Sequence, residues 1–219
     1  MYDVIVVGAG PAGAAATFFL SGRGYKVLTV ERNPGPGTIC GEYVPDPGYL
    51  RVQEEIASNY FEFVRPFTVH RLSGIRVEVY GRSFRVDYVG YSIRRGELLR
   101  ERLRQAEGEG ARVLFRERFL SMKRKGEFYE VLTSGGEYAA RYLVGADGFP
   151  SRISSMIGGG TVDCDEVSIA FPLEVPLEID DPSEMKLFFD EELAPGAYAW
   201  IIPRGSSRAN VGLGIRMSM

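Results

Sequence analysis

The stretch DVIVVGAGPAG, residues 3–13, decides the fold of this chain because it joins an apolar strand to a glycine-rich turn and a helix. Asp3 to Val7 is predicted as a buried parallel strand, since the residues after Asp3 are apolar and β-branched. Gly8 allows a tight turn at the end of this strand. Gly13 lets the helix that follows pack closely against the sheet.

That helix is predicted to begin at Pro11 and to continue to about Ser21. Pro11 suits the first helical turn, because its missing N–H would have no partner there in any case. Gly10 removes a side chain at the point where a pyrophosphate approaches the backbone. The free N–H groups of the first turn, around Ala12, present the positive end of the helix dipole to an anion.

The second predicted strand, Tyr25 to Val30, is followed by Glu31, which lies 23 residues after Gly8. Dinucleotide-binding domains place an acidic residue about 20 residues after the glycine turn, where it binds ribose hydroxyls. The strand, the turn, the helix and the acid agree with one another, so the sequence predicts a dinucleotide site. The glycine pattern alone does not distinguish FAD from NAD.

The overall composition argues against several classes of protein. The 219 residues carry a net charge of −3, whereas proteins that bind nucleic acid normally present a basic face. Cys40 and Cys164 fit neither a disulfide framework nor a zinc site, so no metal is expected. The uncharged run from Val4 to Leu20 is broken by glycines and a proline and lacks a basic start, which argues against a signal peptide or membrane span. We therefore expect a cytoplasmic protein.

A second motif, YLVGADGFPSRI at residues 142–153, is predicted as a strand, a glycine-rich turn and a helix capped by Ser151. On its own, the pair Asp147-Gly148 is equally typical of a plain turn. Together with the opening motif, the stretch resembles FAD-dependent oxidoreductases of the para-hydroxybenzoate-hydroxylase fold. This resemblance implies that the cofactor is FAD and that Asp147 and Gly148 lie near its ribityl and pyrophosphate groups.

A helix is predicted from Arg95 to about Gly108, because apolar residues recur there at helical spacing. These residues are Leu98, Leu99, Leu103 and Ala106. The same resemblance implies that an arginine at the start of this helix contacts the FAD phosphates. Arg95 matches that position best, and Arg94 is the alternative.

The whole pattern predicts an α/β fold in which a Rossmann-like parallel sheet that binds FAD is interleaved with a mainly antiparallel substrate-domain sheet. Stretches such as IRVEVYG and SFRVDYVG alternate apolar and polar residues, as half-buried antiparallel strands do. Later strands are expected at 167–174, 185–189, 198–202 and 209–215. The FAD-binding domain is assigned to residues 1–65 and 95–160, and the substrate domain to 66–94 and 161–219, the last part being incomplete.

Near the end of the chain, PGAYAWIIPRGSSRANVGLGI at residues 195–215 is predicted as a β-hairpin with its turn at 204–207. Period-2 alternation places Tyr198, Trp200 and Ile202 on one face of this hairpin. An aromatic face suits a pocket for an elongated apolar ligand and equally suits a buried core, so the residues alone leave both alternatives open.

The hairpin is similar to the Tyr-x-Trp-x-Phe-Pro motif of the geranylgeranyl reductase family of flavoproteins, although Ile202 stands where that family usually has Phe. The opening motif, CGEYVP at 40–45 and the Asp-Gly turn extend the resemblance over nearly the whole chain. It implies reduction of isoprenoid double bonds by hydride from N5 of reduced FAD, with an apolar isoprenoid or prenyl-lipid substrate. NADPH or ferredoxin would supply the electrons, and a lipid substrate would imply peripheral contact with a membrane.

The resemblance also places Cys40 and Gly41 near the flavin, although Cys40 equally fits simple packing. The candidate catalytic residues are Cys40, Tyr198 and Trp200, whereas His70, the only histidine, is expected to be structural. The full set of expected cofactor-binding residues is Gly8, Gly10, Pro11, Ala12, Gly13, Glu31, Arg32, Cys40, Gly41, Arg95, Asp147 and Gly148.

Two alternative functions stay open. Flavin-dependent halogenases carry Trp-x-Trp-x-Ile-Pro at the hairpin, which matches Ile202-Pro203 but not Tyr198, and their lysine has no counterpart between Arg32 and Leu50. A flavin monooxygenase belongs to the same alternative. The second alternative is a non-catalytic flavin-binding fragment or subunit, because the resembled fold normally continues with motifs that do not follow GLGIRMSM. A second polypeptide would then complete the fold.

Overall fold

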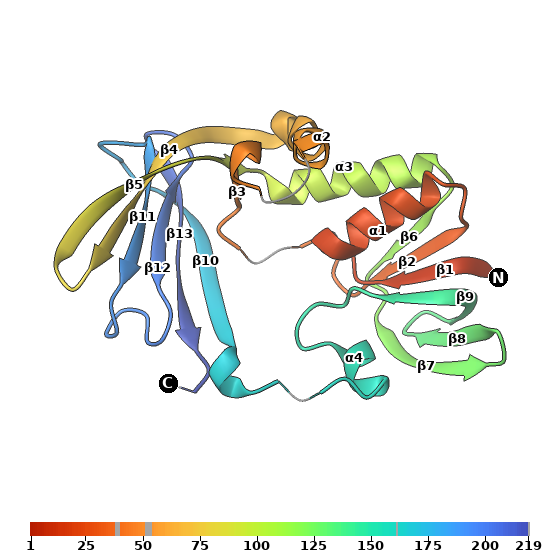
Figure 1. Ribbon diagram of the computed structural model, residues 1–219. Helices are drawn as coiled ribbons and strands as arrows, with labels where there is room; N and C mark the ends of the chain where they lie inside the picture. The colour runs from red at the N-terminus through yellow and green to blue at the C-terminus, as the bar shows by residue number, and fades with distance from the viewer. Residues whose placement is uncertain (38–39, 51–53, 161, 219) are drawn as a thin grey trace. The chain divides into compact units, whose positions relative to one another are not determined.

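The computed structural model describes residues 1–37, 40–50, 54–160 and 162–218 (Figure 1). The chain forms two compact units and passes between them more than once. Unit 1 comprises Met1–Thr38 and Gly96–Thr161, and unit 2 comprises Ile39–Arg95 and Val162–Met219. This interleaving of an amino-terminal nucleotide-type sheet with a second sheet confirms the predicted fold class.

Unit 1 is built on a six-stranded sheet with the strand order β6-β2-β1-β9-β8-β7. The first four strands of this order are mutually parallel, and β8 and β7 continue the sheet as an antiparallel meander. The strands are β1 (Tyr2–Val7), β2 (Val27–Glu31), β6 (Arg112–Phe115), β7 (Phe119–Lys125), β8 (Phe128–Thr133) and β9 (Glu137–Gly145).

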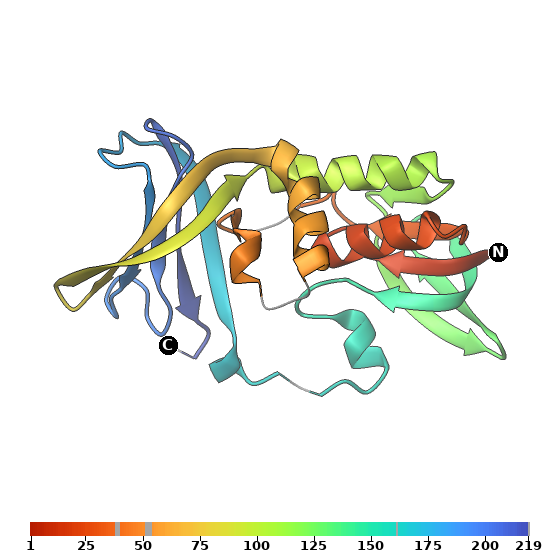
Figure 2. The ribbon, with the colours of Figure 1, turned by 45° about the horizontal axis from the view of Figure 1, so that its top comes forward.

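Two helices cover one face of this sheet (Figures 1 and 2). Helix α1 (Pro11–Ser21) and helix α3 (Arg95–Gly108) bury their small and apolar residues against alternate residues of β1, among them Val4 and Val6. The other residues of β1, which include Ile5, face a second cluster that β2, β7, β8 and β9 complete. Because both faces of β1 are covered, its sequence is continuously apolar, as a buried parallel strand requires. A short helix, α4 (Arg152–Met156), follows β9.

Unit 2 is built on a seven-stranded sheet with the order β10-β13-β12-β11-β4-β5-β3. Its strands pair antiparallel except for β11, which runs parallel to β4. The strands are β3 (Tyr43–Pro45), β4 (Thr68–Val79), β5 (Arg82–Ile93), β10 (Ser168–Pro176), β11 (Glu184–Phe189), β12 (Ala199–Pro203) and β13 (Arg208–Arg216). Helix α2 (Glu54–Val64) and the 3-10 helices η1 (Pro47–Tyr49), η2 (Arg65–Phe67) and η3 (Cys164–Glu166) also belong to it.

The first passage between the units differs from the expected one. The sequence predicted it at residue 65, whereas unit 2 already begins at Ile39. The physical reason is β3, a strand of three residues that pairs with β5 through Tyr43 and Ser92 and so ties its loop to the second sheet. A strand this short has no readable periodicity in the sequence. The other two passages follow Arg95 and precede Val162.

No helix in the described parts of the chain is both long enough and apolar enough to cross a lipid bilayer.

Candidate functional site

In the opening turn of unit 1, the close packing of the backbone requires glycine at two positions. The Gly8 N–H donates to the carbonyl of Val30 at 2.8 Å, and Gly8 has a φ of +99°. A methyl group on Gly8 would collide with the carbonyl oxygen of Ala146, and one on Gly13 would collide with the carbonyl oxygen of Gly8. Side chains at either position would therefore push the turn away from the sheet.

Gly10 is different, because a methyl group there would have no described atom within 4 Å. Its backbone, at φ −69° and ψ −171°, is open to any residue. Gly10 is the N-cap of α1, yet no side chain caps the helix and its first turn carries no acidic residue. The N–H groups of this turn therefore have no partner within the helix. An open backbone at an uncapped helix start is the arrangement that binds phosphate.

Glu31 is buried at the end of β2, and its carboxylate holds the glycine turn in place. Its Oε2 accepts a hydrogen bond from the Ala9 N–H at 2.8 Å, and its Oε1 accepts one from the Asn33 N–H at 2.8 Å. Each carboxylate oxygen keeps a second acceptor position. Glu31 can therefore fix the glycine turn and accept from ribose hydroxyls at the same time.

The Asp147-Gly148 turn is held by its own carboxylate. Asp147 Oδ1 accepts from the Ser151 hydroxyl at 2.8 Å, and Oδ2 accepts from the Arg152 N–H at 2.7 Å. Ser151 caps α4 as the sequence predicted, accepting from the Ser154 N–H at 2.9 Å. Gly148 has a φ of +78°, which explains the glycine. The Asp147 carboxylate thus shapes the turn through its own hydrogen bonds, as a plain-turn interpretation expects.

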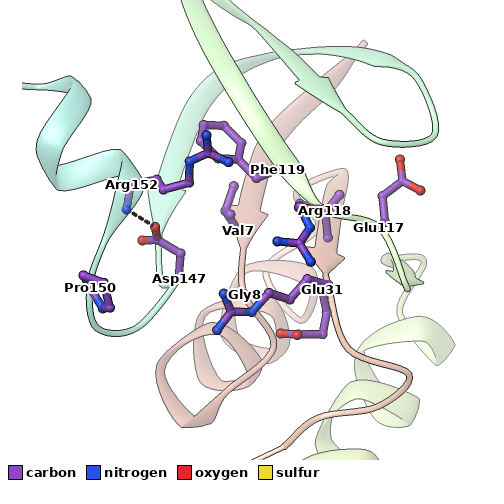
Figure 3. A pocket seen from close by; sticks show the side chains of 11 residues that line it. Val7, Gly8, Glu31, Glu117, Arg118, Phe119, Asp147, Pro150 and Arg152 are labelled. Carbon is purple, nitrogen blue, oxygen red and sulfur yellow. Dashed lines mark hydrogen bonds between the residues drawn. The ribbon is translucent and has the colours of Figure 1, made fainter.

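These groups surround a pocket of about 70 Å³ in unit 1, where Figure 3 shows Glu31, Arg118, Asp147 and Arg152 around the backbone of Val7 and Gly8. The lining residues are Val7, Gly8, Val30, Glu31, Arg32, Glu117, Arg118, Phe119, Asp147, Pro150 and Arg152. The pocket brings together four of the predicted cofactor residues, and its lining carries three arginines and three carboxylates.

Sequence reasoning missed Glu117, Arg118 and Phe119, which line the same pocket. They follow β6, which lies beside β2 and is parallel to it. Ligands of open parallel sheets bind beyond the carboxyl ends of the strands. The predicted strand at Arg112 to Phe115 was therefore the signal that would have found them.

In unit 2, the Cys40 loop lies directly on the β12–β13 hairpin. The Glu42 N–H donates to Cys40 Sγ at 3.2 Å, and Asn210 Nδ2 donates to the Cys40 carbonyl at 3.4 Å. A methyl group on Gly41 would lie 2.6 Å from Cδ1 of Ile202, so the loop backbone lies close to this side chain. Two motifs that are far apart in the sequence, CGEYVP and the aromatic hairpin, form one structure.

An ion pair reinforces this junction. Arg204, whose side chain is only 6% exposed, pairs with Glu42 and also lies 3.3 Å from Glu174 Oε2. Glu42 adopts a positive φ of +54°, an unusual conformation for a non-glycine residue. The hairpin turn at 204–207 therefore holds the Cys40 loop through charge as well as through packing.

The aromatic hairpin resolves into two environments. Trp200 is 7% exposed, packs with Ile202 in the core of unit 2, and donates from Nε1 to Asn210 Oδ1 at 2.8 Å. Tyr198 precedes β12, is 43% exposed, and lies with its ring centroid 5.5 Å from that of Phe189. Trp200 thus belongs to the core of unit 2, whereas Tyr198 is exposed beside it.

Tyr198 and the largely buried Trp200 both line a pocket of about 570 Å³ on unit 2. Its wall is formed by aromatic residues and by small residues such as glycine and alanine. The charged residues of the wall are one glutamate and one arginine. The lining is Ser168, Ala170, Phe189, Glu191, Gly196, Ala197, Tyr198, Trp200, Gly214 and Arg216. A pocket of this size and character is typical of a site for an apolar ligand.

The remaining candidates also have defined places. Arg95 begins α3 and donates from Nη2 to the Tyr43 carbonyl at 3.3 Å, while its Nε is buried without a partner among the described residues. The Arg94 side chain is exposed. His70 Nε2 lies 2.8 Å from the Pro182 carbonyl and links β4 to the segment before β11, which fits a structural role. No cluster of ligating side chains in the described residues could hold a metal ion.

Two sequence families match the chain. Residues 168–219 match the family described as geranylgeranyl reductase catalytic domain, and residues 6–71 match the NAD(P)-binding Rossmann-like domain. Digeranylgeranylglycerophospholipid reductase 1 of Methanopyrus kandleri is 33% identical over 99% of this chain and 58% of its own length. The corresponding reductase of Methanocaldococcus jannaschii is 30% identical over 99% of this chain and 56% of its own. The chain thus spans little more than half the length of these relatives.

Solved structures share the fold. A geranylgeranyl bacteriochlorophyll reductase-like protein of Thermoplasma acidophilum superposes with a TM-score of 0.79 at 23% identity, over 99% of this chain and 57% of its own. PqsL of Pseudomonas aeruginosa gives 0.74 at 21% identity, over 99% and 61%. The myxobacterial halogenase CndH gives 0.73 at 20%, over 99% and 53%. These likenesses establish the architecture of FAD-dependent oxidoreductases.

Proposed function

We propose that this chain has the activity of an FAD-dependent reductase, which acts on the double bonds of a geranylgeranyl or similar isoprenoid chain. The chain is related over nearly its whole length to geranylgeranyl reductases. The observation that carries this proposal is the aromatic pocket of about 570 Å³ around Tyr198 and Trp200. It lies within the segment that matches the reductase catalytic domain, and its apolar wall suits a long hydrocarbon.

FAD is the proposed cofactor, and the residues of unit 1 fit it. The backbone at Gly10 and the first turn of α1 would bind the pyrophosphate, because both are open and the helix start lacks a cap. Glu31 would accept from the ribose hydroxyls of the nucleotide, and Gly8 and Gly13 keep the turn in shape. Arg32, Arg118 and Arg152 supply positive charge around the same pocket.

Bound FAD in its reduced form would supply the hydride that an alkene reduction needs. The chain itself would bind, orient and shield the substrate. Tyr198 presents an exposed ring for contact with the hydrocarbon, whereas Trp200 is a positioning residue whose indole is fixed by Asn210. Cys40 is held beside this hairpin by Asn210 and Gly41, so its thiol is a candidate to deliver the accompanying proton. NADPH or ferredoxin as electron donor, and peripheral contact with a membrane, belong to the same proposal.

The test is to purify the chain, identify any released flavin, and incubate the reduced protein with a geranylgeranyl phospholipid. Mass spectrometry of the product is expected to show added pairs of hydrogen atoms, one pair for each double bond reduced. A chain that binds FAD stoichiometrically but leaves the lipid unchanged would contradict the enzymatic proposal. That result would instead support the flavin-binding subunit, which needs a second polypeptide for turnover.

A halogenase is the second candidate, because Ile202-Pro203 matches the halogenase form of the hairpin and CndH shares the fold. Tyr198 argues against it, since the halogenase motif has Trp at that place. Adding chloride, oxygen and an aromatic acceptor to the reduced protein separates the candidates. A chlorinated product would favour the halogenase, and a hydroxylated product would favour a monooxygenase. We expect neither product.

A further inference from the structure

The aromatic pocket of unit 2 carries a positive charge that a hydrocarbon ligand does not need. Every residue that lines this pocket belongs to unit 2. Its apolar part contains Phe189, Tyr198 and Trp200, whose ring centroids lie 5.5 Å apart for the first pair and 6.1 Å apart for the second. The cation among the lining residues is Arg216. An isoprenoid chain accounts for the aromatic rings, but it offers Arg216 no partner.

Arg216 stands beside a second hydrogen-bond donor at one end of the pocket. It lies directly opposite Ser168 in the ladder between β13 and β10, and residues paired in this way point their side chains to the same face of a sheet. The next pair on that face, Gly214 and Ala170, also lines the pocket. Both Arg216 and Ser168 are exposed, so this end of the pocket is open to solvent.

The loop before β12 holds Arg216 in place. The Arg216 N–H donates to the carbonyl of Pro195 at 3.0 Å, and the Gly214 N–H donates to the carbonyl of Tyr198 at 2.9 Å. A methyl group on Gly196 would lie 2.8 Å from Cβ of Arg216 and 3.3 Å from its Nε. The arginine side chain therefore lies against the loop backbone at Gly196, which is itself part of the pocket wall.

The charge of Arg216 is available to a ligand. The carboxylate of the pocket, Glu191, accepts from the Gly196 N–H at 3.1 Å and is engaged with the loop backbone. Within the described parts of the chain, Arg216 forms no ion pair with any carboxylate. Arg208, at the other end of β13, differs because it lies 2.8 Å from the carboxylate of Glu174. Arg216 thus combines a place in the pocket with an unpaired charge.

We propose that Arg216, with Ser168 beside it, binds the phosphate of a phosphorylated isoprenoid while the aromatic rings contact its hydrocarbon. Arginine donates in a planar fork that matches phosphate oxygens, and a serine hydroxyl donates one more hydrogen bond. Arg216 is then a specificity-determining residue, which favours phosphorylated isoprenoids over neutral ones. A prenyl phosphate and a prenyl phospholipid share this chemistry. This inference rests on the proposed function, because it assigns the head group of the substrate to the same pocket.

The test compares geranylgeranyl phosphate with geranylgeraniol, which has the same hydrocarbon and no charge. Binding of each is followed by the emission of Trp200, the only tryptophan, so neither flavin nor turnover is required. In Arg216→Gln we expect the dissociation constant for the phosphate to rise about fivefold, as for the loss of one exposed ion pair. The dissociation constant for geranylgeraniol is expected to stay the same. Arg216→Lys keeps the charge and is expected to restore part of the difference.

Two more variants separate a phosphate site from general surface charge. Arg208→Gln is the matched control, because it removes a cation from the same strand outside the pocket, and it should change neither dissociation constant. Ser168→Ala is expected to weaken binding of the phosphate by about twofold, as for one exposed neutral hydrogen bond. If Arg216→Gln weakens both ligands equally, the arginine only packs against the hydrocarbon and the inference is wrong.

The remaining outcomes distinguish this inference from the proposed function. If the parent chain binds neither ligand, the assignment of the pocket to an isoprenoid fails, and the inference fails with it. If the parent chain and Arg216→Gln bind both ligands with the same affinity, only the inference fails. Digeranylgeranylglycerol phosphate, titrated in the same way, separates the two sources of phosphate, because the larger loss in Arg216→Gln identifies the head group that Arg216 holds.

Discussion

Trp200 and Asn210 are joined across the β12–β13 hairpin by a buried hydrogen bond of 2.8 Å from the indole Nε1 to the amide Oδ1. The other end of the same amide donates to the Cys40 carbonyl at 3.4 Å. One buried side chain therefore fixes the orientation of the indole and the position of the Cys40 loop. Because Trp200 lines the larger pocket, this amide also determines the shape of the proposed substrate site.

We expect Asn210→Leu to destabilise the chain by about 1–3 kcal/mol, because the buried indole N–H would lose its acceptor. Urea unfolding followed by Trp200 emission measures this change. Ser207→Ala, in the exposed turn of the same hairpin, serves as the control and is expected to change stability by less than about 0.5 kcal/mol. Equal stability of the two variants would show that the amide does not hold the indole.

The glycines of the opening turn are expected to separate folding from cofactor binding. Gly10→Ala should leave stability within about 0.5 kcal/mol of the parent, because its backbone and its surroundings accept a methyl group. It should weaken FAD binding by about tenfold or more, since the methyl group would occupy the place proposed for the pyrophosphate.

Gly13→Ala is the matched comparison for this prediction. Its methyl group would collide with the Gly8 carbonyl, so we expect a loss of about 3 kcal/mol of stability. Thermal unfolding and a flavin titration on both variants provide the measurement. Unchanged FAD affinity in Gly10→Ala would contradict the proposed position of the phosphate.

Glu31→Gln is expected to lower both stability and FAD affinity. The glutamine amide group would face either the Ala9 or the Asn33 N–H, so one of two buried backbone donors would lose its acceptor. We expect a loss of about 1–3 kcal/mol in urea unfolding and a clear rise in the dissociation constant for FAD. Glu127→Gln, at an exposed position of unit 1, should change neither quantity.

The two aromatic residues of the hairpin should respond differently to truncation. Trp200→Ala is expected to cost about 3–5 kcal/mol of stability, since it removes a large side chain from the core of unit 2. Tyr198→Ala should leave stability nearly unchanged, because the ring is substantially exposed, and should lower the rate of isoprenoid reduction. A Tyr198→Ala variant with full activity would remove this residue from the proposed substrate contacts.

Glu184 tests the framework of unit 2 independently of any ligand. It is buried in β11 and accepts from Arg76 Nε at 2.8 Å and from Arg85 Nε at 2.5 Å. We expect Glu184→Gln to cost about 2 kcal/mol, a value reduced because both arginines are partly exposed to solvent. Thermal unfolding measures it, with Glu178→Gln in the loop before β11 as control. A loss equal to that of the control would show that the ion pairs are screened by water.

Much of unit 1 could be predicted from the sequence because its determinants are local. Gly8, Pro11 and Glu31 lie within one strand–turn–helix–strand unit, and each side-chain type is dictated by the backbone next to it. The cap of α4 by Ser151 follows the same rule. The comparisons with known proteins agree with this local pattern, as the match to a Rossmann-like domain covers residues 6–71.

The roles of residues in unit 2 could not be predicted in the same way. Period-2 alternation put Tyr198, Trp200 and Ile202 on one face, yet it could not tell a core from a pocket. Trp200 and Ile202 are buried because β4 and β11 bring Leu72 and Met185 against them, from positions distant in the sequence. The early passage into unit 2 at Ile39 also escaped prediction, because the strand responsible is only three residues long.

The sequence by itself therefore determined the nucleotide-type turn, the alternation of the two sheets and the hairpin at 195–215, since these depend on spacing between neighbouring residues. Only the tertiary structure decided that Glu42 pairs with Arg204, that Asn210 joins Trp200 to Cys40, and that the Tyr43 ring lies over Gly90. These contacts join segments separated by ten to 170 residues, as Trp200 with Asn210 and Cys40 with Asn210 show. Contacts of this kind depend on how the strands assemble and pack as whole sheets. No local sequence pattern specifies that assembly.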